Sequence, residues 1–195
     1  MSLQAMLGAK SNKSARQVDD FYATDPKALE LFIKAINHEG YGNLIQSPIW
    51  ECACGEGHLS NKLKELGYSV YSSDIVDRNN TCDDVIDFLA IDKKWSGTIL
   101  TNPPFKYSEK FVISALDKLV DGTAVFFLKI QFIESLSRYT NLFSKNKPHS
   151  VWAHVTRQKT ARGSNFDDPN NAFMYAWFVW KKSYNGVTEL HWIPK

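Results

Sequence analysis

A short stretch from Thr101 to Phe105 has residue types suited to chemistry on an amino group. The side chain of Asn102 offers one acceptor oxygen and two donor hydrogens, and it directly precedes two prolines. Proline lacks a backbone N–H and has a fixed φ, so Pro103 and Pro104 end the apolar strand before them and leave a stiff turn. The Asn102 oxygen and the Pro103 carbonyl could accept both hydrogens of one planar NH2 group, with Phe105 stacked on the attached ring. The plainer interpretation is a turn that closes a strand.

A strand, a glycine loop and a helix are predicted upstream, between residues 49 and 67. Residues 49–51 form the strand, Gly55 and Gly57 lie in the loop, and leucines at helical spacing follow. Glycine lets a backbone approach a ligand closely, and a helix N-terminus presents free N–H groups. A dinucleotide fingerprint would have a third glycine three residues after Gly57, where Ser60 stands, so that interpretation is weakened.

Asp74 follows the next predicted strand, residues 69–73, and lies 17 residues after Gly57. That spacing is close to the ~20 residues at which an acid hydrogen-bonds ribose hydroxyls. A further strand, residues 97–100, leads into Asn102. Ligands of doubly wound sheets bind at the carboxyl ends of the strands, so the glycine loop, Asp74 and Asn102 are predicted to share one site.

These motifs, in this order, resemble those of the S-adenosylmethionine-dependent amino-methyltransferases. The chain is similar to small adenine-N6 DNA methyltransferases of the phage or prophage type, and residues 102–105 match the family's Asn-Pro-Pro-aromatic motif. The resemblance implies an α/β fold, the Rossmann-like class I methyltransferase fold, with a mostly parallel seven-stranded sheet and a reversed C-terminal hairpin. The chain length fits one domain, expected to be a methyltransferase domain over residues 19–195. Residues 1–18 are polar and lack periodicity, so we expect them to form a flexible arm.

The resemblance also implies the site residues. The catalytic ones are Asn102, Pro103, Pro104 and Phe105. The cofactor, S-adenosylmethionine, would be held by Tyr22, Thr24, Glu51, Ala53, Cys54, Gly55, Gly57, Asp74, Ile75, Asp87 and Phe88. The chain departs from the family pattern at Cys52, where proline is frequent, and at Ala53, where an aromatic residue is frequent.

Basic residues concentrate late in the chain, although the net charge is only +2. No acidic residue lies between Glu134 and Asp167, and six of the 23 basic residues do, which leaves 17 basic against 21 acidic residues elsewhere. A basic region on an acidic body suits a phosphate backbone, although a solvated surface explains it too. Within the hydrophilic loop predicted at residues 156–171, the candidate DNA contacts are Arg157, Lys159 and Arg162.

Composition excludes several classes of protein. The 195 residues have no apolar run near the ~20 residues needed to cross a bilayer, and the first 18 lack the apolar core of a secretion signal. Three cysteines are too few for a disulfide framework or a four-ligand zinc site, so we expect reduced thiols, no metal and a cytoplasmic location.

Several elements are predicted from the periodicity of the second half of the chain. They are a helix from residue 111 that ends at Gly122, a strand at 124–128, a helix over 132–143, a strand at 151–155 and a long strand over 172–180. Three alternatives to DNA methylation stay open: methylation of RNA bases, methylation of a protein glutamine, and a non-catalytic binding module.

Overall fold

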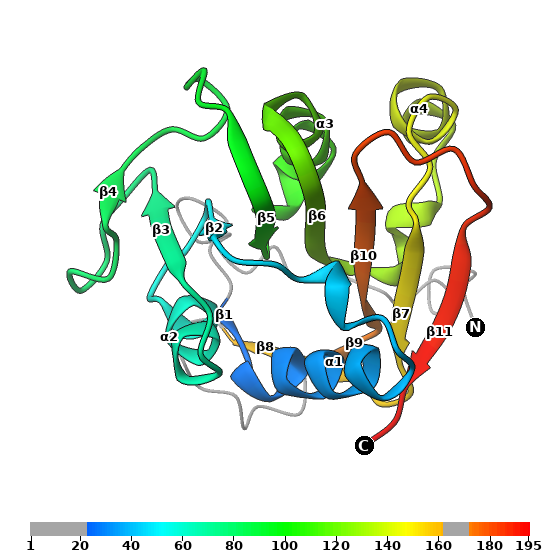
Figure 1. Ribbon diagram of the computed structural model, residues 1–195, viewed down its shortest axis with the longest axis horizontal. Helices are drawn as coiled ribbons and strands as arrows, with labels where there is room; N and C mark the ends of the chain where they lie inside the picture. Colours follow the sequence, from blue (N-terminus) through cyan, green and yellow to red (C-terminus); the bar gives the residue numbers. More distant parts are fainter. Residues whose placement is uncertain (1–22, 162–171) are drawn as a thin grey trace, which may run out of the picture.

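The computed structural model describes residues 23–161 and 172–195, which fold around one large sheet. The strands of this sheet are Ile49–Glu51 (β2), Val70–Asp74 (β3), Asp84–Val85 (β4), Trp95–Thr101 (β5), Leu119–Lys129 (β6), Ser150–His154 (β7), Tyr175–Lys181 (β10) and Glu189–Ile193 (β11). Their order across the sheet is β11-β7-β10-β6-β5-β2-β3-β4 (Figure 1). The sheet therefore has eight strands in the described residues, one more than predicted.

Most neighbouring strands are parallel, as predicted. β2 runs parallel to both β3 and β5, and β5 runs parallel to β6. The reversed strand is β10, which lies between β6 and β7 and is antiparallel to both, with Trp177 opposite Phe127 on one side and Trp152 on the other. The predicted reversal at the C-terminal end of the sheet is confirmed. The added strand, β11, extends this end by pairing parallel to β7.

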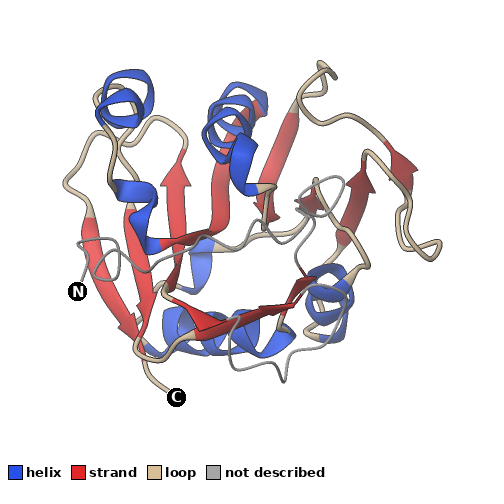
Figure 2. Cartoon of the chain, turned by 180° about the vertical axis from the view of Figure 1, so that it is seen from behind, coloured by secondary structure: helices blue, strands red, loops and turns tan. Residues whose placement is uncertain are grey.

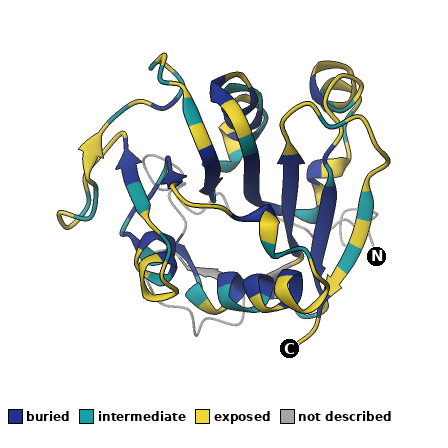
Figure 3. Ribbon diagram, viewed as in Figure 1, coloured by how far each residue is buried: buried dark blue, intermediate teal, exposed yellow. Residues whose placement is uncertain are grey.

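Helices cover the two faces of the sheet. Helices α1 (Pro26–His38) and α2 (His58–Glu65) pack on one face, and α3 (Ser108–Lys118) packs on the other. The central strands are buried on both faces, so β10 reads as a continuous apolar run rather than an alternating one. Figure 3 shows this burial in the middle of the sheet and the exposed outer faces of the helices.

An aspartate directly before a proline is a typical helix start, so Asp25-Pro26 predicts a helix here, and α1 begins at Pro26. Asp25 is its N-cap and accepts a hydrogen bond from the Lys27 backbone N–H at 2.9 Å, and Pro26 occupies the first turn. A short 3-10 helix, η2 (Gly42–Leu44), follows α1. Within the described residues, no helix is both long and apolar enough to span a bilayer. The predicted arm, residues 1–18, lies outside the described residues.

A second sheet has three short strands, β1 (Ala23–Thr24), β8 (Gln158–Ala161) and β9 (Ala172–Phe173), in the order β1-β8-β9 (Figure 2). Two predictions were wrong here. The segment 156–171 is not all loop, because β8 lies inside it, and the long strand predicted over 172–180 is interrupted at Met174. Since β9 leaves the large sheet to pair with β8, the chain must turn between β9 and β10.

The helix predicted over 132–143 is also wrong. The segment contains a 3-10 helix, η4 (Ile130–Ile133), a short α-helix, α4 (Leu136–Arg138), and a π-helical turn, η5 (Tyr139–Phe143). The Arg138 guanidinium donates to the backbone carbonyls of Phe132 and Glu134. Those carbonyls are acceptors that a regular helix would use for its own N–H groups, so the helix starts late and irregularly.

Gly122 does not end a helix, contrary to the prediction. Helix α3 ends at Lys118, and Gly122 lies inside β6, which starts at Leu119. Gly122 has φ +88°, and a Cβ atom there would lie 1.9 Å from the carbonyl oxygen of Gly97 on β5. Glycine is needed at this position because two backbones approach closely, a requirement that looks the same in sequence as a helix end.

Candidate active site

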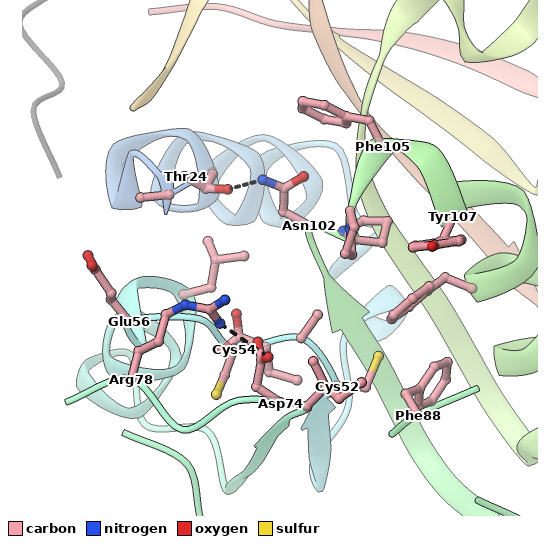
Figure 4. Close-up of a pocket in the computed structure, with 18 of the residues that line it drawn as sticks. Thr24, Cys52, Cys54, Glu56, Asp74, Arg78, Phe88, Asn102, Phe105 and Tyr107 are labelled. Atoms are coloured by element: carbon pink, nitrogen blue, oxygen red, sulfur yellow. Dashed lines mark hydrogen bonds and ion pairs between the residues drawn. The ribbon is translucent and has the colours of Figure 1, made fainter. Parts of the chain in front are cut away.

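One cavity of about 900 Å³ opens at the carboxyl ends of the parallel strands. It lies beyond the ends of β2, β3 and β5, where the glycine loop, Asp74 and Asn102 follow their strands. Its wall includes the predicted residues Thr24, Glu51, Ala53, Cys54, Asp74, Ile75, Asp87, Phe88, Asn102, Pro103, Pro104 and Phe105. Residues scattered over 82 positions of sequence therefore meet at one edge of the sheet (Figure 4).

Asn102 is held in one orientation by a residue far away in sequence. Strand β5 ends at Thr101, and the Nδ2 atom of Asn102 donates to Thr24 Oγ1 at 2.8 Å. Thr24 is only 3% exposed and belongs to β1, so this acceptor is itself fixed. Because the amide nitrogen faces Thr24, the amide oxygen is turned away from it, as Figure 4 shows.

Phe105 forms an aromatic wall beside this amide. It begins a 3-10 turn, η3 (Phe105–Tyr107), directly after the two prolines. Its ring lies 6.1 Å from the ring of Tyr175, which is almost completely buried, and the ammonium of Lys129 lies 4.5 Å from the Phe105 ring centroid. Phe105 is therefore packed from behind and remains partly exposed towards the cavity.

The glycine loop is tied to Asp74. Gly57 has φ +77° and is the N-cap of α2, and a Cβ atom there would come within 3.1 Å of the Thr81 side chain. The Gly55 N–H donates to Asp74 Oδ2 at 2.8 Å. Neither glycine is among the residues lining the cavity, so both shape the loop from behind while Ala53 and Cys54 face the cavity.

Two carboxyl groups lie at this edge in different environments. Glu51 is 2% exposed, accepts a hydrogen bond from Ser60 Oγ, and has its pKa raised to about 8 by burial. Asp74 accepts from the Val76 N–H at 3.1 Å and pairs with Arg78 at 3.3 Å. Each carboxylate oxygen has two lone pairs, so Asp74 can still accept hydrogen bonds from a ligand.

Three further predicted cofactor residues, Ile75, Asp87 and Phe88, also line the cavity. Phe88 is buried against Trp50 and Phe111, with ring centroids 5.1 and 5.2 Å away, and reaches the cavity from beneath. Ile75 is 59% exposed and supplies an apolar surface at the mouth. Asp87 is exposed, and its Oδ1 accepts from the Leu89 N–H at 2.9 Å, which fixes the turn that carries Phe88.

Two of the cysteine side chains are in contact. Cys54 Sγ lies 2.9 Å from Cys82 Sγ, and burial raises the pKa of both thiols, so they stay protonated. Within residues 23–161 and 172–195, no cluster of three His, Cys, Asp or Glu side chains could bind a metal ion.

Some predicted residues lie away from the cavity or outside the described residues. Arg157 is exposed and does not line the cavity. Lys159 belongs to β8, and Tyr22 and Arg162 lie outside the described residues.

Several residues of the cavity wall were not predicted from the sequence. They are Glu56, His58 and Arg78 on the glycine-loop side, and Lys106, Tyr107 and Lys129 on the Asn102 side. Lys129 could have been found, because it ends strand β6 at the same edge of the sheet. Lys106 and Tyr107 directly follow the predicted motif, but their residue types alone do not indicate that they line a binding site.

This chain resembles known proteins in structure and not in sequence. No family model matches the sequence, and no curated protein matches it. Among solved structures, a proposed class I S-adenosylmethionine-dependent methyltransferase from Listeria monocytogenes is similar, with a TM-score of 0.54 and 12% identity over 93% of this chain and 68% of that one.

Two further solved structures have the same architecture. A proposed RNA methyltransferase from Pyrococcus horikoshii has a TM-score of 0.53 and 15% identity over 81% of this chain and 84% of that one. The magnesium protoporphyrin IX methyltransferase of Synechocystis, solved with bound S-adenosylmethionine, has a TM-score of 0.52 and 13% identity over 81% of this chain and 79% of that one. The chain therefore has the fold of the class I S-adenosylmethionine-dependent methyltransferases.

Proposed function

We propose that this protein transfers a methyl group from S-adenosylmethionine to the exocyclic N6 amine of adenine in DNA. One observation carries the proposal: a single cavity is lined by the glycine loop, by Asp74 and by the Asn-Pro-Pro-Phe turn. A cofactor site and an amine-orienting site in one cavity are what direct transfer between two bound molecules requires.

The chain has suitable residues for the cofactor. Asp74 ends β3 and can accept hydrogen bonds from ribose hydroxyls, while Ile75 and Phe88 offer apolar surface for a base. Glu51 and the loop before α2 line the same cavity, and we expect them to hold the amino-acid part of the cofactor. When bound, S-adenosylmethionine supplies a methyl group on a positively charged sulfur, which is a good leaving group.

Asn102 would orient the acceptor rather than act as a base. The lone pair of an exocyclic adenine amine is delocalised into the ring, so the nitrogen must be held in a geometry that directs this pair at the methyl group. We infer that Asn102 Oδ1 and the Pro103 carbonyl accept the two N–H hydrogens while Phe105 stacks on the base. Positioning and electrostatic stabilisation then provide most of the acceleration.

An adenine in duplex DNA must leave the helix to reach such a site, at a cost of about a few kcal/mol. Two features support a nucleic-acid partner. The acid-free interval from 135 to 166 carries six basic residues, and its strand β8 pairs with β1, the strand that contains Thr24. The exposed side chain of Arg157 directly precedes β8.

The test supplies methyl-labelled S-adenosylmethionine together with duplex DNA, RNA or a protein extract, and identifies the modified residue by mass spectrometry. We expect N6-methyladenine in DNA, lost in Asn102→Ala, with cofactor binding by calorimetry unchanged. Asn43→Ala is the matched control, because it makes the same chemical change at an exposed position in η2. Label only in RNA or protein would overturn the substrate, and full turnover by Asn102→Ala would overturn the mechanism.

A further inference from the structure

We propose that Tyr107, flanked by Lys106 and Lys110, is a docking platform for the nucleotide next to the target adenine. The base of that nucleotide stacks on the Tyr107 ring and its phosphate lies against the two ammonium groups. This inference rests on the proposed function and adds to it a positioning surface outside the Asn-Pro-Pro-Phe motif.

The backbone fixes Tyr107 at the mouth of the cavity. Tyr107 is the last residue of η3, and its N–H donates to the Pro104 carbonyl at 2.9 Å. The side chain lines the cavity and is 39% exposed. Figure 4 shows it across the cavity from Glu56 and Arg78, on the side of the proline turn. A rigid turn therefore presents an exposed ring two residues after Phe105.

Tyr107 is not used to build the protein interior. Phe105 packs on the core cluster beneath α1, whereas Tyr107 belongs to neither of the two core clusters found in the described residues. Its ring is therefore left partly exposed at the cavity instead of buried in either cluster. Proteins bind unpaired nucleic acid by stacking its bases on such rings, together with positive charges that contact the backbone.

Two cations lie over this ring. The ammonium of Lys106 is 5.2 Å from the Tyr107 ring centroid and that of Lys110 is 6.0 Å away. Both lysines are exposed, and they lie four residues apart across the start of α3. Glu109 lies between them in sequence, but its carboxylate accepts a hydrogen bond from Asn141 Nδ2 at 3.0 Å. An aromatic ring with two ammonium groups over it can meet both parts of a nucleotide. The ammonium groups attract the phosphate, and the base stacks on the ring when a flexible lysine side chain swings aside.

The experiment measures methylation kinetics and binding of a fluorescent oligonucleotide that contains one adenine. We expect Tyr107→Ala to raise KM and the oligonucleotide Kd on the order of 10-fold, with cofactor affinity unchanged. Tyr107→Phe keeps the ring and should restore both values. Trp192→Ala, which removes an aromatic ring with 59% exposure from the edge strand β11, is the control and should change neither.

A second measurement tests stacking directly. On an oligonucleotide that lacks the base next to adenine, native protein and Tyr107→Ala should bind equally, because no base is left to stack. Lys110→Gln should weaken binding to both oligonucleotides and reduce the salt dependence. If the native protein methylates DNA and Tyr107→Ala keeps the native KM and Kd, the present inference is wrong. If the native protein neither binds nor methylates nucleic acid, the proposed function itself has failed.

Discussion

The hydrogen bond between Asn102 and Thr24 gives the sharpest test of how this site works. Replacing Thr24 with valine keeps the branched shape that β1 requires and removes only the hydroxyl that accepts from Asn102 Nδ2 at 2.8 Å. The amide can then rotate, so its oxygen is no longer held in the orientation that we infer for accepting the substrate amine. We expect kcat to fall while the affinity for the cofactor stays the same.

The structure sets the size of this effect. Leaving a buried donor without a partner costs about 1–3 kcal/mol, equivalent to roughly 5- to 150-fold in rate. Thr24 is 3% exposed, but Asn102 is only partly buried and water can replace part of the lost bond. We therefore expect a decrease in kcat in the lower part of this range, about 5- to 30-fold.

The assay measures initial rates of label transfer at saturating cofactor and DNA, with cofactor Kd determined separately by calorimetry. Thr24→Ser is the matched control, because it keeps the hydroxyl and should keep most of kcat. A Thr24→Val enzyme with native kcat would refute the idea that this bond orients Asn102. A rise in cofactor Kd without a change in kcat would instead support the role in cofactor binding that the sequence predicts for Thr24.

Three further predictions concern the core, the strand contacts and the basic segment. Burial raises the pKa of Glu51 from its ordinary value of 4.5 to about 8 in the folded protein. Between these two pH values the folded protein keeps a proton that the unfolded chain releases, so the free energy of unfolding falls as the pH rises. Glu51→Gln should lose less stability than the native protein between pH 5 and 8, measured by thermal unfolding; parallel pH profiles would contradict this. At Gly97, φ is +116° and a Cβ atom would lie 2.4 Å from the Pro48 carbonyl oxygen. Gly97→Ala should lower the free energy of unfolding, measured with urea, by about 2–3 kcal/mol. Gly67→Ala is the control and should lower it by about 1 kcal/mol, because Gly67 has a positive φ of +89° but no atom within 4 Å of the added Cβ. Equal losses in the two variants would exclude the clash. Replacing the three predicted DNA contacts with alanine should reduce the slope of log Kd against log salt by up to about 0.9 per lost phosphate contact, and an unchanged slope would remove the segment from the interface. These residues are Arg157, Lys159 and Arg162.

Local signals in the sequence predicted much of the site. The aspartate–proline start of α1, the glycine loop and the strand ending at the two prolines each depend on neighbouring residues, and the order of the motifs then places them at one sheet edge. Contacts between distant residues could not be predicted. The hydrogen bond from Asn102 to Thr24 joins residues 78 positions apart, and the type of neither residue predicts it.

The wrong predictions have the same physical origin. The apolar spacing at residues 132–143 suggests one helix, but Arg138 takes the carbonyls that this helix would need. Gly122 has the residue type of a helix end, but the close approach of Gly97 explains it. In both places a tertiary contact determines the backbone, and single-residue propensities carry no information about it.

The small three-stranded sheet connects the segment proposed to bind DNA with the residue proposed to hold the target amine. Strand β8 pairs with β1 at Thr24 and Thr160, and Thr24 in turn holds Asn102. A partner that binds β8 more tightly in this arrangement stabilises the oriented amide by the same free energy. By reciprocity, a base bound at Asn102 increases the affinity of β8 for that partner by an equal factor. Binding at the segment predicted to contact the DNA backbone would therefore change the affinity at the residue predicted to hold the target amine, and the reverse, without direct contact between them.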